Sequence, residues 1–245
     1  MYSTNLVLLS GQMALQQSAD IVANNIANAS TTGFKREGIQ FETYLSRGAG
    51  TKATSYVQDR ATYRDNSPGT INATGNPLDL AIQGQGYFEV QTPNGTQYTR
   101  DGAFRTDSQG QIVTSTGLPV LSDGGQAITL ADDARDITIS GDGFLTAQIG
   151  TGAARAQLGK IGVVKFDNDA AVVPTTGGLL TTTQTPTPIT GNVVVQGAIE
   201  DSNVKPVTEI TDLISIQRAY EQATNLIGNE NSRLSDAIDK LSQSS

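Results

Sequence analysis

The sequence contains no cysteine and no histidine. These absences exclude disulfides, thiol nucleophiles, most zinc sites and the usual general base of enzymes. A chain without cysteine is compatible with an oxidising or a reducing compartment, because nothing in it depends on redox state. Tryptophan is also absent, and hydrophobic residues make up 37% of the chain, which supports a core but a lean one.

Acidic residues outnumber basic residues by 24 to 16, which gives a formal net charge of −8. Because the sequence has no basic cluster, it is a poor candidate for binding nucleic acid or an anionic membrane. No stretch approaches about 18 consecutive apolar residues, so we expect no membrane insertion. Residues 1–20 contain neither Lys nor Arg and no apolar h-region, and we therefore expect no cleaved Sec-type signal peptide.

A heptad pattern runs through the C-terminal stretch, residues 207–241. One set of seam positions is Ile210, Gln217, Thr224, Asn231 and Ile238, and the other is Leu213, Tyr220, Ile227, Leu234 and Leu241. Such a pattern predicts a long helix with one narrow seam, which needs a partner to cover it. Pro206 suits the first turn of this helix, and Glu209 lies where a carboxylate interacts favourably with the helix dipole.

The N-terminal stretch, residues 6–29, also predicts a helix. Its apolar residues recur at helical spacing, at Leu8, Leu15, Ala19, Val22, Ile26 and Ala29. The weak helix formers Asn24, Asn25 and Asn28 indicate that packing stabilises this helix, and Gly33 suits a left-handed C-terminal cap. The two terminal helices are the obvious partners of each other. Periodicity alone leaves open whether they form a two-helix stalk on a monomer or contribute to a bundle of several chains.

Between the helices the pattern changes to β. Residues 34–73 have no clean period and predict an extended connector with one candidate strand at 57–63. From Gly75 to Gly191, short alternating stretches separated by glycine turns predict hairpins, with a long loop at 175–190. The expected fold class is α+β: two long terminal helices that pair as a coiled coil, and a central antiparallel β domain built as a sandwich or a partly open barrel.

No stretch of the sequence predicts an active site. Residues 84–86 lack the third glycine of a dinucleotide fingerprint and precede a predicted strand, so we expect a tight turn. Residues 167–169 look like the start of a calcium loop but lack its glycine. Glu200 and Asp201 form an adjacent acidic pair, which we expect to be solvated. We therefore predict no catalytic residue, no cofactor and no metal site.

Several stretches resemble the flagellar rod and hook protein family. Residues 23–35 (ANNIANASTTGFK) look like the specific N-terminal motif of that family. Stretches that resemble its shared β core and its C-terminal lead-in follow at 74–82 (TGNPLDLAI), 86–88 (GYF), 98–104 (YTRDGAF) and 202–204 (SNV). Together with the final helix, the resemblance covers essentially the whole chain.

Within that family, the chain length and residues 57–63 and 203–207 are more similar to the proximal-rod member than to the distal-rod member. The resemblance implies a structural, non-enzymatic rod subunit whose terminal helices form an inner coiled-coil region (D0) and whose β domain lies outside it (D1). It assigns residues 1–33 and 204–245 to D0, 34–74 to the connector and 75–203 to D1.

The resemblance also implies partners and a location. The expected partners are proximal and distal rod proteins, copies of the same chain and the flagellar type III export apparatus. Export by that route needs no cleaved signal. The rod of the basal body crosses the periplasm, assembles from its subunits and transmits torque for motility, so the helical seams are expected to pack against other subunits.

The residues expected to carry subunit assembly lie on both terminal helices. They are Leu8, Leu15, Val22, Asn25, Ile26, Asn28, Ile210, Leu213, Gln217, Tyr220, Thr224, Ile227, Asn231, Leu234, Ile238 and Leu241. The polar members Gln217, Thr224 and Asn231 are expected to set the register of the helix at some cost in stability.

Other functions remain open at this point. The chain could be a distal-rod or hook paralogue. From a different class, it could be a secreted β-rich adhesin or binding module with a helical multimerisation stalk. An enzyme that acts on peptidoglycan ranks third.

Overall fold

The computed structural model describes residues 2–46, 54–150 and 155–243, and it confirms the α+β fold class. Backbone contacts divide the chain into two compact units. The helical unit comprises Met1–Asn28, Arg36–Asp65 and Val204–Ser245, and the β unit comprises Ala29–Lys35 and Asn66–Asn203. The chain therefore passes from one unit to the other several times, and the four-part division of the sequence stays a prediction.

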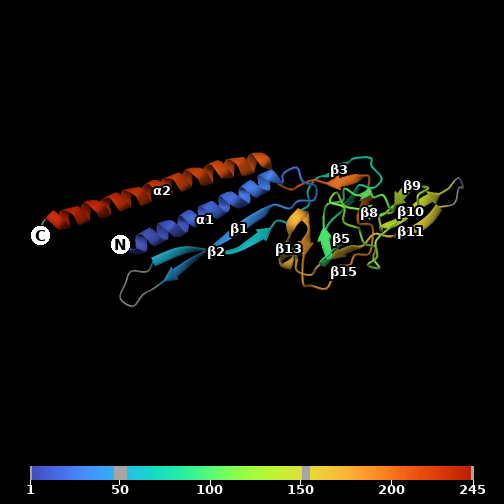
Figure 1. Ribbon diagram of the computed structural model, residues 1–245, viewed down its shortest axis with the longest axis horizontal. Coiled ribbons are helices and arrows are strands. Elements are labelled where there is room, and N and C mark those ends of the chain that lie inside the picture. The colour runs from blue at the N-terminus through green and yellow to red at the C-terminus, as the bar shows by residue number, and fades with distance from the viewer. Residues whose placement is uncertain (1, 47–53, 151–154, 244–245) are drawn as a thin grey trace. The chain divides into compact units, whose positions relative to one another are not determined.

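Two long helices, α1 (Tyr2–Ala27) and α2 (Pro206–Gln243), dominate the helical unit. They lie side by side and antiparallel, which confirms the predicted pairing (Figure 1). Pro206 occupies the first turn of α2, where its missing N–H costs no hydrogen bond and its fixed φ suits the helix. Both helices extend slightly beyond the predicted ranges, except that α1 ends before residue 29.

A long hairpin lies within the segment for which the sequence predicts an extended connector. Strands β1 (Glu37–Ser46) and β2 (Thr54–Arg64) pair antiparallel, and the predicted strand at 57–63 lies inside β2. Both strands contact α1 (Figure 1). A lone two-stranded hairpin is marginal in water, so this cover from α1 stabilises it.

The β unit is built from antiparallel sheets. Its largest sheet has the order β13-β14-β6-β5-β12-β15, formed by Val173–Pro174, Leu180–Thr181, Gly95–Thr99, Tyr87–Thr92, Val163–Lys165 and Thr187–Pro188. A second sheet has the order β11-β10-β9, formed by Arg155–Lys160, Phe144–Ile149 and Ala134–Ile139. Two-stranded pairs are β16 (Val194–Gln196) with β4 (Leu80–Ile82), β17 (Ala198–Glu200) with β3 (Ile71–Ala73), and β7 (Arg105–Thr106) with β8 (Ile112–Val113). Within the described residues no sheet closes into a barrel.

The largest sheet is buried on both faces around β5. Phe88 and Val90 point into the main core, where Phe88 meets Phe104 edge to face at 5.1 Å. The preceding residue, Tyr87, belongs to a second cluster with Tyr98 and other apolar residues. Consecutive residues of a strand point to opposite faces, so β5 supplies one side chain to each core in turn.

The turn predicted to end the first helix has a different role. Gly33 has the expected positive φ of 69°, but α1 already ends at Ala27, so Gly33 is not its cap. The Gly33 N–H donates to the Glu200 carbonyl at 2.7 Å, and a Cβ at Gly33 would lie 2.5 Å from the Arg100 backbone. Close backbone packing therefore fixes residues 29–35 within the β unit.

A buried ion-pair cluster centred on Glu200 joins distant passages of the β unit. Glu200 is only 1% exposed, and its carboxylate accepts from Lys35 Nζ at 2.6 Å and Arg100 Nη2 at 2.6 Å. The backbone N–H of Gly69 donates to the same carboxylate at 2.9 Å, and Lys35 Nζ also donates to the Ser67 carbonyl at 2.7 Å. The expectation that Glu200 is solvated is wrong, because two cations balance its charge inside the protein.

The electrostatics of Glu200 follow from these contacts. Burial by itself would raise the pKa of the Glu200 carboxyl, but the Arg100 guanidinium and the hydrogen bonds from Lys35 and Gly69 outweigh burial and hold this pKa below its usual range. Elsewhere in the β unit, burial raises the pKa of Glu89, and it raises the pKa of Asp101 despite hydrogen bonds from Ala103 and Ser115 that lower it.

Replacing Glu200 by Gln should destabilise the β unit by about 3–5 kcal/mol, because Lys35 and Arg100 would stay buried without a counter-charge. The matched control is Asp201→Asn, which neutralises the half-exposed neighbouring acid and should cost less than about 1 kcal/mol. Urea unfolding of the full chain, followed by circular dichroism in the β region, measures both. Equal losses in the two variants would contradict a special role for Glu200.

The cost of Glu200→Gln should also depend on pH. Since folding lowers the pKa of Glu200, its charge stabilises the fold fully above the unfolded value of about 4.5, and the stabilisation is lost as pH falls through the folded pKa. Glu89 and Asp101 have the opposite trend, but they are common to both proteins. The difference in unfolding free energy between wild type and variant should be constant near neutral pH and shrink below about pH 4.5. A difference that persists unchanged to about pH 3 would exclude this origin of the stability.

Candidate interaction surface

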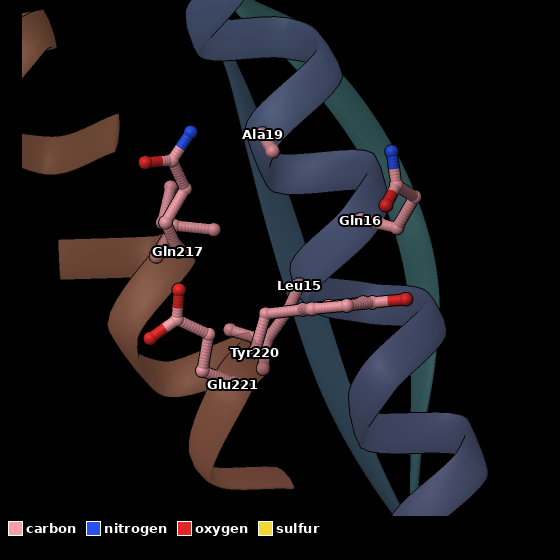
Figure 2. A pocket seen from close by; sticks show the side chains of 7 residues that line it. Leu15, Gln16, Ala19, Gln217, Tyr220 and Glu221 are labelled. Atoms are coloured by element: carbon pink, nitrogen blue, oxygen red, sulfur yellow. The ribbon is translucent and has the colours of Figure 1, made fainter. Parts of the chain in front are cut away.

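A groove opens between the two helices of the helical unit. It has a volume of about 440 Å³ and is lined by Leu15, Gln16 and Ala19 of α1 and by Ile216, Gln217, Tyr220 and Glu221 of α2. Figure 2 shows the Tyr220 ring extending from α2 toward α1 at the level of Leu15. Since its floor is apolar and its rim polar, the groove can receive an apolar side chain framed by hydrogen-bonding groups.

The inner face of α2 follows a heptad that differs from the predicted one at half of its positions. Half-buried residues occur at Leu213, Ile216, Tyr220, Ala223 and Ile227, with alternating spacings of three and four. Leu213, Tyr220 and Ile227 belong to the predicted apolar set. Ile216 and Ala223 occupy the seam in place of Gln217 and Thr224. Burying these apolar side chains needs no hydrogen-bond partner, whereas burying an amide or hydroxyl does.

The other predicted seam set lies at the exposed edge of α2. Ile210 is 47% exposed, and Gln217, Thr224 and Asn231 are also exposed. Thr224 nevertheless connects the helices, because its Oγ1 accepts a hydrogen bond from Gln12 Nε2 of α1 at 3.0 Å. The predicted positions Leu234, Ile238 and Leu241 belong to α2, but their side chains lie outside the described residues.

The predicted residues of α1 are mostly covered. Val22 and Asn25 are buried, and Leu8, Leu15, Ile26 and Asn28 are half-buried. Asn28 closes the end of the helix, since its backbone N–H and its side-chain amide both donate to the Asn24 carbonyl, at 3.1 and 3.0 Å. The weak helix formers of this stretch therefore stabilise the helix end through specific side-chain hydrogen bonds, since their helix propensity is low.

Asn25 and Glu209 form a buried polar junction of three elements. Asn25 is fully buried, and its Nδ2 donates to the Glu37 carbonyl of β1 at 2.8 Å and to Glu209 Oε2 of α2 at 3.1 Å. The Glu37 N–H donates back to Asn25 Oδ1 at 2.9 Å. Arg36 Nε pairs with Glu209 Oε1 at 2.5 Å, and this hydrogen bond raises the pKa of the Arg36 guanidinium. The junction fixes where α1, β1 and the start of α2 meet.

Asn25 and Glu209 each stand out in the sequence, but the hydrogen bond between them was not predicted. Asn25 appears in the predicted set as part of a motif, and Glu209 appears as a helix-dipole partner. Glu209 does lie in the first turn of α2, but its burial to 1% exposure calls for the cation and the amide that it receives. The pairing spans 184 residues of sequence, so no local pattern could have indicated it.

The structure contains no sign of a metal or membrane site where it is described. No three side chains of His, Cys, Asp or Glu gather as metal ligands among the described residues. Neither helix, over its described length, is both long and apolar enough to cross a bilayer.

Comparison with known proteins agrees with this architecture. Three family models match: "Flagella basal body rod protein" over residues 6–35, "Flagellar hook protein FlgE/F/G D1 domain" over 81–147, and "Flagellar basal body rod FlgEFG protein C-terminal" over 195–240. The chain is 41% identical to the flagellar basal-body rod protein FlgF of Caulobacter vibrioides, with 95% of each chain covered. The chain belongs to the flagellar basal-body rod protein family. It is also 37% identical to FlgF of Mesorhizobium japonicum, with 98% of each chain covered.

Membership of the flagellar rod family confirms the predicted resemblance and bears on the open alternatives. A relative of a second kind, the rod protein FlgG of Agrobacterium fabrum, is 36% identical over 90% of this chain and 92% of its own. The family is structural and not enzymatic, which excludes the hypothesis of an enzyme that acts on peptidoglycan. A flagellar rod protein assembles with other rod subunits. The two rod models match residues 6–35 and 195–240, which contain most of α1 and of α2.

Replacing Asn25 by Ala should disorder the helical unit of this rod protein. The variant leaves the Glu37 N–H and carbonyl without their partner and removes one donor from buried Glu209, at a cost of about 1–3 kcal/mol for each unsatisfied group. Circular dichroism at 222 nm during a thermal scan should show earlier loss of helix, with the β-sheet transition unchanged. The matched control is Asn24→Ala, an exposed neighbour on the same helix. Identical helix melting in both variants would refute the junction's importance.

Proposed function

We propose that this chain is an FlgF-type subunit of the proximal rod of the bacterial flagellum. The observation that carries the proposal is the 41% and 37% identity to two FlgF proteins over nearly the full length of each chain. Similarity to FlgG of Agrobacterium fabrum, at 36%, keeps a distal-rod subunit as the second candidate. An assembly function needs no active site, and the sequence predicts none. Such a protein acts through the surfaces that it presents to other subunits.

Assembly is proposed to run through the terminal helices as an inner D0 region, with the β unit serving as the outer D1 domain. The residues of the seam divide into two groups. Half-buried residues such as Leu213 and Tyr220 hold α1 and α2 together within one chain. Exposed residues such as Ile210, Gln217 and Asn231 are free to contact neighbouring subunits and set their register.

The proposed partners are copies of this chain and proximal and distal rod proteins, after delivery by the flagellar type III export apparatus. The rod would occupy the periplasmic part of the basal body, and export would need no cleaved signal. Torque transmission requires stiff contacts between subunits, and two long helices per chain supply a large surface for them. Each Leu, Ile or Val that becomes fully buried on assembly contributes roughly 1.5–3 kcal/mol.

Complementation of a deletion strain tests this function. Cells that lack the gene should be non-motile, with basal bodies that stop before the distal rod, and the wild-type gene should restore both. Leu213→Asp or Val22→Asp should fail to restore them, because a charge on the inner seam or in the core of the helical unit separates the helices. The matched control Leu213→Met preserves volume and apolar character and should restore motility.

Two results would count against the proposal. Full motility of the deletion strain would exclude an essential rod role. Normal incorporation of Leu213→Asp into basal bodies would exclude assembly through the helix pair. Basal bodies that stop after the proximal rod is complete would instead favour the distal-rod candidate. Urea unfolding of purified Leu213→Asp should retain the β-unit transition, which separates failed assembly from global unfolding.

A further inference from the structure

The first turns of α2 carry an apolar surface that the described residues leave exposed. Val207 is 79% exposed, Ile210 47% and Ile214 44%. Their spacings of three and four place them on one stripe of the helix, which we call the α2 ridge. Contiguous exposed apolar side chains of this kind mark interaction sites in soluble proteins.

A second apolar surface lies on α1. Leu9 is 52% exposed and Met13 is 66% exposed, four residues apart on the same stripe. We call this pair the α1 ridge. The remaining faces of α1 near these residues are half-buried, because α2 and the β1–β2 hairpin both contact this helix.

Both ridges run along their helices into the groove. On α2 the stripe continues from Ile214 by three and four residues to Gln217 and Glu221, and on α1 it continues from Met13 by three residues to Gln16. Gln16, Gln217 and Glu221 all line the groove (Figure 2). The ridges and the groove therefore form one continuous surface on one side of the helix pair.

The two ridges of one chain cannot cover each other. The pairs Asn25–Glu209 and Gln12–Thr224 fix the antiparallel alignment of the helices. In this alignment Ile210 lies level with residues near Asn25, about 12 residues from Met13. At 1.5 Å per residue, Met13 and Ile210 of one chain are about 18 Å apart along the axis. A second copy of the chain can bring each ridge to the other.

Charge selects which helix of another copy suits the α2 ridge. α2 carries six acidic and three basic residues, whereas α1 carries one charged residue, Asp20. An α2 helix brought against a second α2 helix would meet like charge, but the nearly neutral α1 would not. The flexible Met13 side chain also suits packing on an irregular apolar ridge.

We propose that the α1 ridge of one copy packs on the α2 ridge of a neighbouring copy, so that Met13 of the first lies over Ile210 of the second. The proposal rests on the proposed rod function and names the contact through which copies of the chain meet. Because the contact joins two different patches, each copy keeps one ridge available for the next copy, as an extended assembly requires.

Disulfide trapping tests this contact directly, since the natural chain has no cysteine. The double variant Met13→Cys, Ile210→Cys is expressed in the deletion strain, and isolated basal bodies are mildly oxidised and blotted after non-reducing electrophoresis. Intermolecular disulfides should give covalent dimers and higher multimers. The 18 Å separation prevents a bond within one chain, because a disulfide needs Cα atoms within about 7 Å. The matched control replaces Ile210→Cys by Thr211→Cys, which is exposed but lies 100° around the helix.

The outcomes separate the two proposals. Motile cells with multimers in the test pair and none in the control support the ridge contact. Motile cells without multimers overturn it and leave the rod function standing, and bonding of Ile210→Cys alone to itself would show an α2–α2 contact instead. Motility of the deletion strain itself would overturn the rod function. If the cysteines reduce motility, charge exchange decides: Met13→Asp and Ile210→Lys should each block incorporation, and together they should restore it. Failure of the combined variant would overturn the contact.

Discussion

Burial of a carboxylate is the constraint on which the β unit depends. Glu200 remains charged inside the protein only because Lys35 and Arg100 reach it together. The other donors of Arg100 are used as well, since its Nη1 donates to the carbonyls of Gly84 and Gly86 at 2.9 and 2.7 Å. A cluster made only in part would leave an unpaired charge in the interior, which is far more costly than an unpaired charge in water. The segment that contains Lys35, the end of β6 and strand β17 must therefore come together when the β unit folds.

The helical unit uses the same physical device at a second carboxylate. Glu209 lies at the start of α2 and is balanced by Arg36 and by the amide of Asn25. Lys35 and Arg36 are consecutive in the sequence, yet each serves a different buried acid in a different unit. A short basic pair thus fixes the chain on either side of its passage between units. Within the motif at residues 23–35, the buried polar residues Asn25 and Lys35 are therefore each matched to one of these acids.

The parts of the fold that were predictable are those in which one local period decides the structure. Apolar residues at helical spacing predicted α1, heptad spacing predicted α2, and glycine turns with alternating residues predicted the antiparallel hairpins. For the β1–β2 hairpin only the strand at 57–63 was predicted, because residues 34–73 have no clean period. The burial of Glu200 was not predicted, since Lys35 lies 165 residues away. For the candidate surface, Leu213, Tyr220 and Ile227 lie on the face of α2 that packs against α1, whereas Gln217 and Thr224 lie exposed beside it, and their role in assembly stays a prediction.

The error in the seam arises from a real property of α2. Leu213, Tyr220 and Ile227 can belong to two overlapping heptads, one completed by Ile216 and Ala223 and the other by Ile210, Gln217, Thr224 and Asn231. Packing against α1 selects the first, because that seam is apolar and needs no buried hydrogen bonds. The second stripe then remains exposed beside it, apolar at the start of the helix and polar beyond. A helix with two adjacent seams can hold its own partner and still meet another chain. We therefore expect the polar residues to restrict that second contact rather than weaken the first.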